Sequence, residues 1–156
     1  MEYFTNHPSP IGDLLLTSDG TALTGLYLPR QTKPAALLFR EDLPLFSDTK
    51  DWLDRYFAGD PTSVNFPIFP QGTEFQKQVW NILLTIPYGK TLSYGQIARQ
   101  LSPSMSAQAV GGAVGRNPIS IIIPCHRCVG AKGQLTGYAG GLEAKNWLLR
   151  HEEETK

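Results

Sequence analysis

An apolar run that leads into proline, cysteine, histidine and arginine constrains this chain more than any other feature. Residues 119–123 are Ile-Ser-Ile-Ile-Ile, and β-branched residues in so short a run predict a strand that is buried on at least one face. Pro124 ends such a strand because it has no N–H to donate. We therefore expect Cys125 at the rim of a hydrophobic core, with His126 and Arg127 beside it.

The position of Cys125 allows two interpretations. It is either a small apolar residue that ends the strand or an activated nucleophile. A free thiol has a pKa of about 8.5, so only a few per cent is thiolate at neutral pH unless a base or a positive charge helps. His126 is a candidate base and Arg127 a candidate source of positive charge, and these neighbours favour the nucleophile.

The composition is that of a globular protein. A chain of 156 residues suits one domain, or one domain with a small partner, and is long enough to bury a core. Its two cysteines are three residues apart, which excludes a disulfide framework. The sequence contains no membrane span and no secretory signal pattern. We therefore expect a cytoplasmic protein with reduced cysteines and no membrane partner.

Charge is unevenly distributed although the total is zero. Residues 1–72 carry nine acidic and five basic side chains, whereas residues 75–150 carry eight basic side chains and one acid, Glu143. A segment with such an excess can meet a polyanion whatever the net charge is. The distribution favours a nucleic-acid partner, and a surface polarised by chance is the alternative.

Short strands and one helix are predicted in the first part of the chain. Residues 14–17 and 23–28 flank an Asp-Gly turn, which is a strong hairpin signal. Residues 48–58 predict a helix that ends at a glycine. The Pro- and Gly-rich stretch 66–72 follows as a linker. We therefore expect a strand-and-helix domain over residues 1–70.

The second part is predicted to be mainly helical. Thr73 and Ser93 each have Gln three residues later, the spacing of a capping box, and each precedes apolar residues at helical spacing. A third helix begins at Ser106, so the helices from Ser93 and Ser106 predict a helix-turn-helix. A last helix covers residues 142–151, and the three glutamates after it are expected in solvent. Residues 71–156 would form this domain of an α/β (α+β) fold.

Two segments are poor in side chains. In the predicted helix of residues 107–115, each interior glycine costs about 1 kcal/mol relative to alanine, so the bare surface is expected to permit a close approach. The partner is either a neighbouring helix or a DNA minor groove, which is about 6 Å wide. The glycine-rich residues 137–141 lack the spacing of phosphate-binding motifs, and no nucleotide cofactor is expected.

Five segments in matching order and spacing resemble the O6-alkylguanine-DNA alkyltransferase family, the methylated-DNA–protein-cysteine methyltransferases. The resemblance implies a DNA repair protein that flips a damaged guanine out of the duplex and moves its alkyl group irreversibly onto its own cysteine, in a single turnover and without a cofactor. It is faint over residues 1–70, where it implies a small ribonuclease H-like domain without chemistry of its own. The matching segments are residues 93–98, 109–113 with 117–118, 123–127, 137–141, and 147–149 with 151–152.

The resemblance assigns five residues to catalysis. Cys125 matches the alkyl acceptor, His126 the base that deprotonates it through a water, and Glu152 the carboxylate that orients the histidine. Tyr94 matches the tyrosine that meets the extruded nucleotide and protonates the departing guanine. Asn117 matches the asparagine that braces the turn into the cysteine segment.

The resemblance also implies which residues meet the DNA. Val114 matches an apolar position of the reading helix, and Gln108 stands where the family carries an arginine that fills the gap left by the base. Glutamine lacks the charge and the stacking plane of guanidinium, so weaker DNA binding or slower flipping is expected. The other expected DNA contacts are Ala109, Arg116, Arg127 and Tyr94, and the expected guanine pocket comprises Cys128, Tyr138, Ala139 and Lys145.

The expected partner is double-stranded DNA that carries O6-alkylguanine, with O4-alkylthymine as a second candidate lesion. Metal-bearing members of the family use an N-terminal zinc site, but residues 1–72 contain no cysteine and only His7, so no metal is expected. We expect a monomer, with cooperative binding on DNA left open.

Two other activities fit parts of the sequence. Cys125 and Cys128 form a C-x-x-C motif, which suggests a thiol–disulfide oxidoreductase, although no helix is predicted directly after it. The helix-turn-helix with its basic segment also fits a non-catalytic module that binds DNA lesions. The cysteine argues against that module, because family members that only bind DNA lack the nucleophile.

Overall fold

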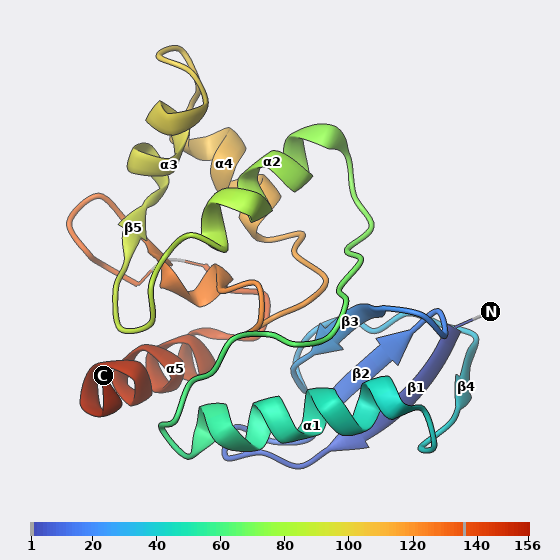
Figure 1. The fold of residues 1–156 in the computed structure, drawn as a ribbon. Helices are drawn as coiled ribbons and strands as arrows, with labels where there is room; N and C mark the ends of the chain where they lie inside the picture. The colour runs from blue at the N-terminus through green and yellow to red at the C-terminus, as the bar shows by residue number, and fades with distance from the viewer. Residues whose placement is uncertain (1, 136) are drawn as a thin grey trace.

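The N-terminal half is a four-stranded sheet covered on one face by a helix. The computed structural model describes residues 2–135 and 137–156, and Figure 1 shows α1 lying across the sheet. The strand order is β3-β2-β1-β4, with β4 parallel to β1 and the other neighbours antiparallel. The bounds are β1 (Glu2–His7), β2 (Leu14–Ser18), β3 (Leu23–Tyr27), β4 (Leu37–Phe39) and α1 (Pro44–Phe57).

Local sequence signals predicted most of these elements correctly. The hairpin of β2 and β3 is confirmed, and the Asp19 carboxylate accepts the backbone N–H groups of Thr21 and Ala22 at its turn. The helix begins earlier than predicted because Pro44 at its first position suits a helix start. It ends before Gly59, whose φ of +80° suits a residue without Cβ.

The C-terminal half contains the helix-turn-helix predicted from the sequence. The two capping boxes are confirmed, because Thr73 and Ser93 each accept the backbone N–H of the glutamine three residues later. Helices α3 and α4 pack together after a short turn (Figure 1). The bounds are α2 (Glu74–Leu83), β5 (Leu92–Ser93), α3 (Tyr94–Leu101), α4 (Ala107–Val114), the 3₁₀ turn η1 (Cys125–Arg127), β6 (Cys128–Val129) and α5 (Leu142–Thr155).

The predicted strand over residues 119–123 is wrong. These residues are buried, but they form consecutive tight turns in which Ile121 has a φ of +71° and Ile123 N–H donates to the Ile119 carbonyl at 3.0 Å. Only Ile119 pairs with a strand, through a bridge to Leu26. Apolar β-branched residues predicted burial correctly, but burial alone does not specify an extended backbone.

The expected end of the last helix is also wrong. Helix α5 continues to Thr155, and Glu152 is 1% exposed instead of solvated. Of the three glutamates, Glu153 and Glu154 are exposed as expected. The sequence around them gives no indication of the buried partners that hold Glu152.

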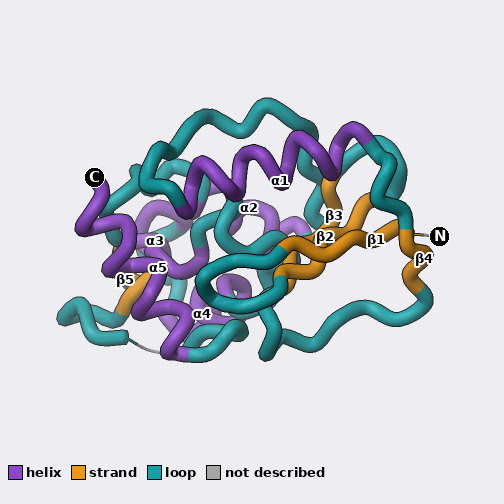
Figure 2. The backbone as a smooth tube through the Cα atoms, turned by 90° about the horizontal axis from the view of Figure 1, so that it is seen from below, coloured by secondary structure: helices purple, strands orange, loops and turns teal. Residues whose placement is uncertain are grey.

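The two halves are joined through one hydrophobic cluster. Leu26 N–H donates to the Pro118 carbonyl at 2.9 Å, and Ser120 N–H donates to the Leu26 carbonyl at 3.1 Å, so β3 contacts the segment that leads to Cys125. Figure 2 shows α1 and α5 on neighbouring parts of the molecule. The boundary near residue 70 stays a prediction. None of the helices in the described ranges has the length and apolarity that a bilayer crossing needs.

Candidate active site

A single side-chain amide shapes the segment that presents Cys125. Asn117 follows α4 and is 4% exposed; its Nδ2 donates to the carbonyls of Ile119, at 3.3 Å, and Ile123, at 2.8 Å. Its Oδ1 accepts the Ile119 N–H at 3.0 Å. These bonds satisfy backbone groups that a strand would have paired in a ladder. The contacts fit the bracing role expected for Asn117, although the segment is a series of turns.

Cys125 lies in the wall of a cavity of about 360 Å³. The thiol-bearing residue is 5% exposed and begins the 3₁₀ turn η1. The cavity collects residues from both halves, because the start of α3, the end of α4, the loop before α5 and the loop after β3 all reach it. Its lining consists of Gln31, Tyr94, Gly111, Val114, Gly115, Asn117, Cys125, Gly137, Tyr138 and Ala139.

The buried thiol does not ionise readily by itself. Burial raises the pKa of Cys125, while the neighbouring Asn117 and Tyr138 side chains and the charge of Lys145 act in the opposite direction without reversing the shift. An uncharged thiol is a weak nucleophile. The site therefore needs a base that can take the proton.

His126 is held in the orientation that a base requires. Its side chain is fully buried, and its Nε2 lies 2.6 Å from the Oε2 atom of Glu152. Burial lowers the pKa of His126 despite the opposing effect of the carboxylate, so the ring is neutral at neutral pH. An ionised carboxylate can only accept, so Nε2 carries the proton and Nδ1 keeps a lone pair.

The other ring nitrogen, Nδ1, has no hydrogen-bond partner in the part of the chain that the structure describes. Within the described ranges, His126 Nδ1 is a buried polar atom without a hydrogen-bond partner, and Tyr138 Oη is another. Buried polar groups are usually satisfied, so an unpaired one needs an explanation. The lone pair on Nδ1 is available to accept a proton from the thiol, directly or through a water.

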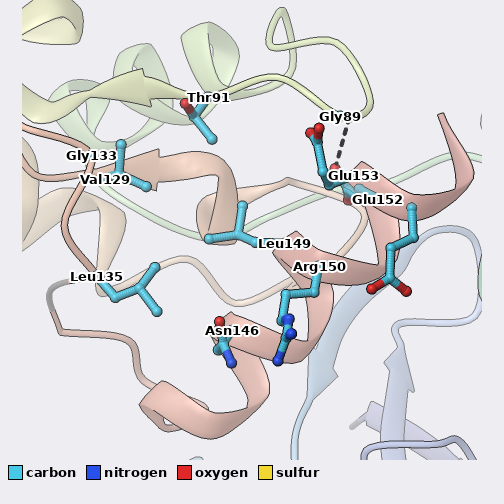
Figure 3. A pocket seen from close by; sticks show the side chains of 11 residues that line it. Gly89, Thr91, Val129, Gly133, Leu135, Asn146, Leu149, Arg150, Glu152 and Glu153 are labelled. Carbon is cyan, nitrogen blue, oxygen red and sulfur yellow. Dashed lines mark hydrogen bonds between the residues drawn. The ribbon is translucent and has the colours of Figure 1, made fainter.

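Glu152 is surrounded by donors. Its Oε2 accepts from Tyr56 Oη at 2.6 Å, His126 Nε2 at 2.6 Å and Arg127 Nη2 at 3.0 Å. Its Oε1 accepts from Arg127 Nε at 2.8 Å and from the backbone N–H of Gly89 at 3.1 Å, the bond dashed in Figure 3. Burial raises the pKa of Glu152, but the bonds and charges of His126 and Arg127 outweigh it and hold that pKa well below its usual range.

The DNA contact expected of Arg127 stays a prediction, and the structure shows this side chain engaged within the protein. The side chain is 12% exposed, and besides Glu152 its guanidinium donates to the Ile86 carbonyl at 2.7 Å. Each of the three guanidinium nitrogens of Arg127 thus donates a hydrogen bond inside the molecule. Arg127 holds the carboxylate that orients His126, which is a different task from contacting phosphate.

Lys145 is fully buried behind the cavity. Its Nζ lies 5.8 Å from the ring centroid of Tyr94 and 6.0 Å from that of Tyr138. Burial lowers the pKa of Lys145, and the neighbouring Cys128 and Cys125 oppose that shift. Burial likewise raises the pKa of Cys128 to about 12, so this second thiol is neutral. Cys128 and Lys145 back the cavity, whereas Tyr138, also expected in the guanine pocket, lines it.

Most of the chain matches models of one protein family. Residues 74–154 match the DNA binding domain of 6-O-methylguanine DNA methyltransferase, and residues 3–70 match its ribonuclease-like domain. The chain belongs to the 6-O-methylguanine DNA methyltransferase family.

Individual members of this family match the chain over nearly its whole length. The methylated-DNA–protein-cysteine methyltransferase of Mycobacterium tuberculosis is 47% identical over 154 residues, which cover 98% of this chain and 93% of that protein. The enzyme of the same name from Haemophilus influenzae is 44% identical, with 97% and 86% covered. The crystal structure of Mycobacterium tuberculosis OGT in complex with DNA has a TM-score of 0.91 at 46% identity, with 98% and 94% covered.

These similarities confirm the family and the α/β fold class expected from the sequence. They favour the methyltransferase over the thiol–disulfide oxidoreductase and over the module that only binds DNA. The site residues of this methyltransferase chain stay predictions, and the structure shows where each of them lies.

Most of the residues expected to meet DNA lie on or near α4, and all of these except Val114 are at least partly exposed. Gln108 and Ala109 on α4 and Arg116 just after it are exposed, and Tyr94 and Val114 line the cavity. Val114 is only 6% exposed, so it faces the cavity and not open solvent. Ala139 is exposed at the cavity rim, as its expected place in the guanine pocket requires.

Two residues of the N-terminal half belong to the candidate site but were not predicted from the sequence. Gln31 lines the cavity, and Tyr56 bonds to Glu152 across 96 positions of sequence. Tyr56 belongs to the apolar stripe of α1, and a buried tyrosine in such a stripe usually needs a partner for its hydroxyl. That requirement was the available signal, but it could not identify the partner.

Proposed function

We propose that this chain repairs duplex DNA by transferring the alkyl group of O6-alkylguanine to Cys125 in a single irreversible step. One observation carries the proposal: a buried cysteine in a cavity wall is followed by a histidine whose Nε2 is held 2.6 Å from a carboxylate and whose Nδ1 has no partner in the described part of the chain. This arrangement suits proton removal from a thiol of raised pKa.

The first step generates the thiolate. His126 Nδ1 takes the Cys125 proton, with a water between the two groups, and Glu152 stabilises the imidazolium that forms. Lys145 adds positive charge behind the thiolate. Because the surroundings are buried, these charges act more strongly than they would in water.

The second step moves the alkyl group. The sulfur forms a bond to the alkyl carbon in line with the bond from that carbon to guanine O6, which breaks and leaves its electron pair on guanine. Tyr94, on the cavity wall, supplies the proton that makes guanine a neutral leaving group. The product is a thioether, which the side chains of this site cannot reverse, so each molecule acts once.

The cavity suits a flipped base. Its volume of about 360 Å³ falls within the usual range of ligand pockets, about 300–1,000 Å³. Extruding a base costs a few kcal/mol, and less where the lesion pairs poorly. The backbone of residues 137–139 and the side chain of Gln31 would bind the edges of the base. Alkyl groups on O4 of thymine are a second candidate substrate.

The DNA face is proposed to be the surface around α4. Gln108, Ala109 and Arg116 are exposed there beside the cavity mouth. The chain is proposed to act as a monomer in the cytoplasm. Because Gln108 cannot supply a guanidinium plane, Gln108→Arg should bind a lesion-bearing duplex several-fold more tightly or repair it faster. Single-turnover rates and binding isotherms check this, and the absence of any gain would refute it.

The direct test is intact mass after incubation with a duplex that contains O6-methylguanine. The protein should gain one methylene, located on Cys125 by peptide mapping, while Cys125→Ser should gain nothing. Repair that continues beyond one lesion per protein molecule, or an unchanged mass after the lesion is gone, would refute the proposed function.

A further inference from the structure

A tyrosine from the N-terminal half reaches the acid of the candidate site. Tyr56 lies near the end of α1, is 1% exposed, and places its Oη 2.6 Å from the Oε2 atom of Glu152 on α5. The end of α1 lies next to α5 in Figure 1, where His151 and Trp147 of α5 contact Tyr56 and Phe57. The sequence analysis expected no chemistry from residues 1–70.

The direction of this hydrogen bond is determined by the charges of its partners. Glu152 is held ionised, so its oxygens only accept. Burial and the charge of Glu152 raise the pKa of Tyr56, so its hydroxyl keeps its proton. Tyr56 therefore donates to the same oxygen atom that receives the Nε2 proton of His126.

Sharing one oxygen couples the two donors. A hydrogen bond from Tyr56 draws electron density from Oε2 and so weakens the attraction of that oxygen for the ring proton. A less attractive carboxylate lowers the tendency of His126 to become imidazolium. The same bond restrains the carboxylate, and with it the plane of the ring.

We infer that Tyr56 is a positioning residue for the alkyl transfer: through its hydrogen bond to Glu152 it sets the basicity and the orientation of His126. The inference rests on the proposed function only for its consequence on rate. The link from Tyr56 to His126 is a property of the protein without DNA and can be measured separately.

A purely structural role for Tyr56 would depend on its ring. The ring packs against Trp52, Phe57, Tyr88 and His151, with centroid distances from 5.2 to 5.8 Å. Tyr56→Phe keeps these contacts and removes only the hydroxyl. Tyr88→Phe is the matched control, because Tyr88 belongs to the same cluster but its hydroxyl bonds to Thr155 Oγ1 at 2.7 Å.

The experiment follows His126 in two ways. NMR titration of the histidine rings gives its pKa in the full chain without DNA, and the pH dependence of single-turnover methyl transfer gives the midpoint of the acidic limb. Losing one neutral donor should raise both values by about 0.5–1 pH unit in Tyr56→Phe, and Tyr88→Phe should leave them unchanged.

A second variant keeps the hydroxyl and therefore the fold. Replacing Tyr56 by a fluorotyrosine makes the phenol a stronger donor, so both values should move downward. Coincidence of Tyr56→Phe with the wild type, or equal shifts in the two phenylalanine variants, would overturn the inference. If the wild type transferred no methyl group but the NMR shifts appeared as expected, the proposed function would fail and the coupling would stand.

Discussion

The two nitrogens of the His126 ring lie in contrasting surroundings. On the Nε2 side, Glu152 accepts five hydrogen bonds from four residues, two of them in the same helical turn, one in a loop and one in the N-terminal half. His126 Nδ1, in contrast, has no hydrogen-bond partner within the described ranges, and neither has Oη of Tyr138, which lines the Cys125 cavity. The surroundings of Glu152 are therefore saturated with hydrogen bonds, whereas those of His126 Nδ1 are incomplete.

This difference separates positioning from reaction. A carboxylate with all its acceptor sites filled cannot turn, so it holds the ring at low cost when charge develops on it. A cavity with unpaired polar atoms leaves groups available for water and for a base. The contrast predicts larger effects for a change at Glu152 than for changes at residues near the cavity that take no part in the proton transfer, such as Gly112 and Cys128.

Glu152→Gln should give the largest effect because it removes the buried carboxylate that accepts five hydrogen bonds. The amide presents N–H groups to neighbours that are all donors, and Arg127 loses its buried counter-charge. We expect a loss of about 3–5 kcal/mol in the free energy of unfolding and a fall in methyl-transfer rate of at least about 10²-fold. Urea unfolding and single-turnover mass spectrometry measure these; a folded variant with wild-type rate would refute the assignment.

The pH dependence of the reaction tests the boundary between the two sides. Burial lowers the pKa of His126 below its usual 6.5. Protonation of the ring removes the base, so the rate should fall as the pH decreases through this lowered pKa and should not fall at higher pH. Burial raises the pKa of Cys125, so direct thiol ionisation would instead make the rate climb about tenfold per pH unit through neutrality. A steep rise of that kind in a pH–rate profile would contradict base assistance.

Gly112→Ala tests whether the bare face of α4 approaches DNA closely. Gly112 is exposed within α4 and an added Cβ meets no atom within 4 Å, so alanine should stabilise the fold by about 1 kcal/mol. If the bare helix face approaches DNA closely, the same methyl group should weaken duplex binding several-fold. Thermal unfolding and binding isotherms separate these effects, with Asn146→Ala on exposed α5 as the control. Unchanged affinity in Gly112→Ala would exclude a close approach at this position.

Cys128→Ala should give the smallest effect on rate. The thiol is neutral and lies behind the cavity, so methyl transfer to Cys125 should stay within about twofold of wild type, while the small void costs about 1 kcal/mol of stability. Mass spectrometry checks the transfer. Complete loss of methylation would mean that the two cysteines act together.

Signals confined to a few neighbouring residues predicted structure well. The capping boxes at Thr73 and Ser93 and the Asp-Gly hairpin are decided by hydrogen bonds within a turn, and all three are present. The resemblance to the alkyltransferases also named Cys125, His126 and Glu152, and the fold brings the last two into contact.

Predictions from residue composition failed where a particular side-chain contact determined the outcome. Residues 119–123 have the composition of a strand, but the amide of Asn117 supplies the bonds that bend them into turns. The DNA contact expected of Arg127 stays a prediction, but its charge gave no sign that all three guanidinium nitrogens donate to Glu152 and the Ile86 carbonyl. Residue composition alone does not report such contacts.

The sequence by itself determined the family, the starts of α2 and α3, the helix-turn-helix and the adjacent cysteine and histidine, because these depend on residue types at short spacing. Only the tertiary structure decided that Glu152 is buried, that Tyr56 donates to it and that Nδ1 of His126 has no partner among the described residues. These features arise when α1, α5 and η1 pack against one another, and the energy of a buried charge depends on every group around it.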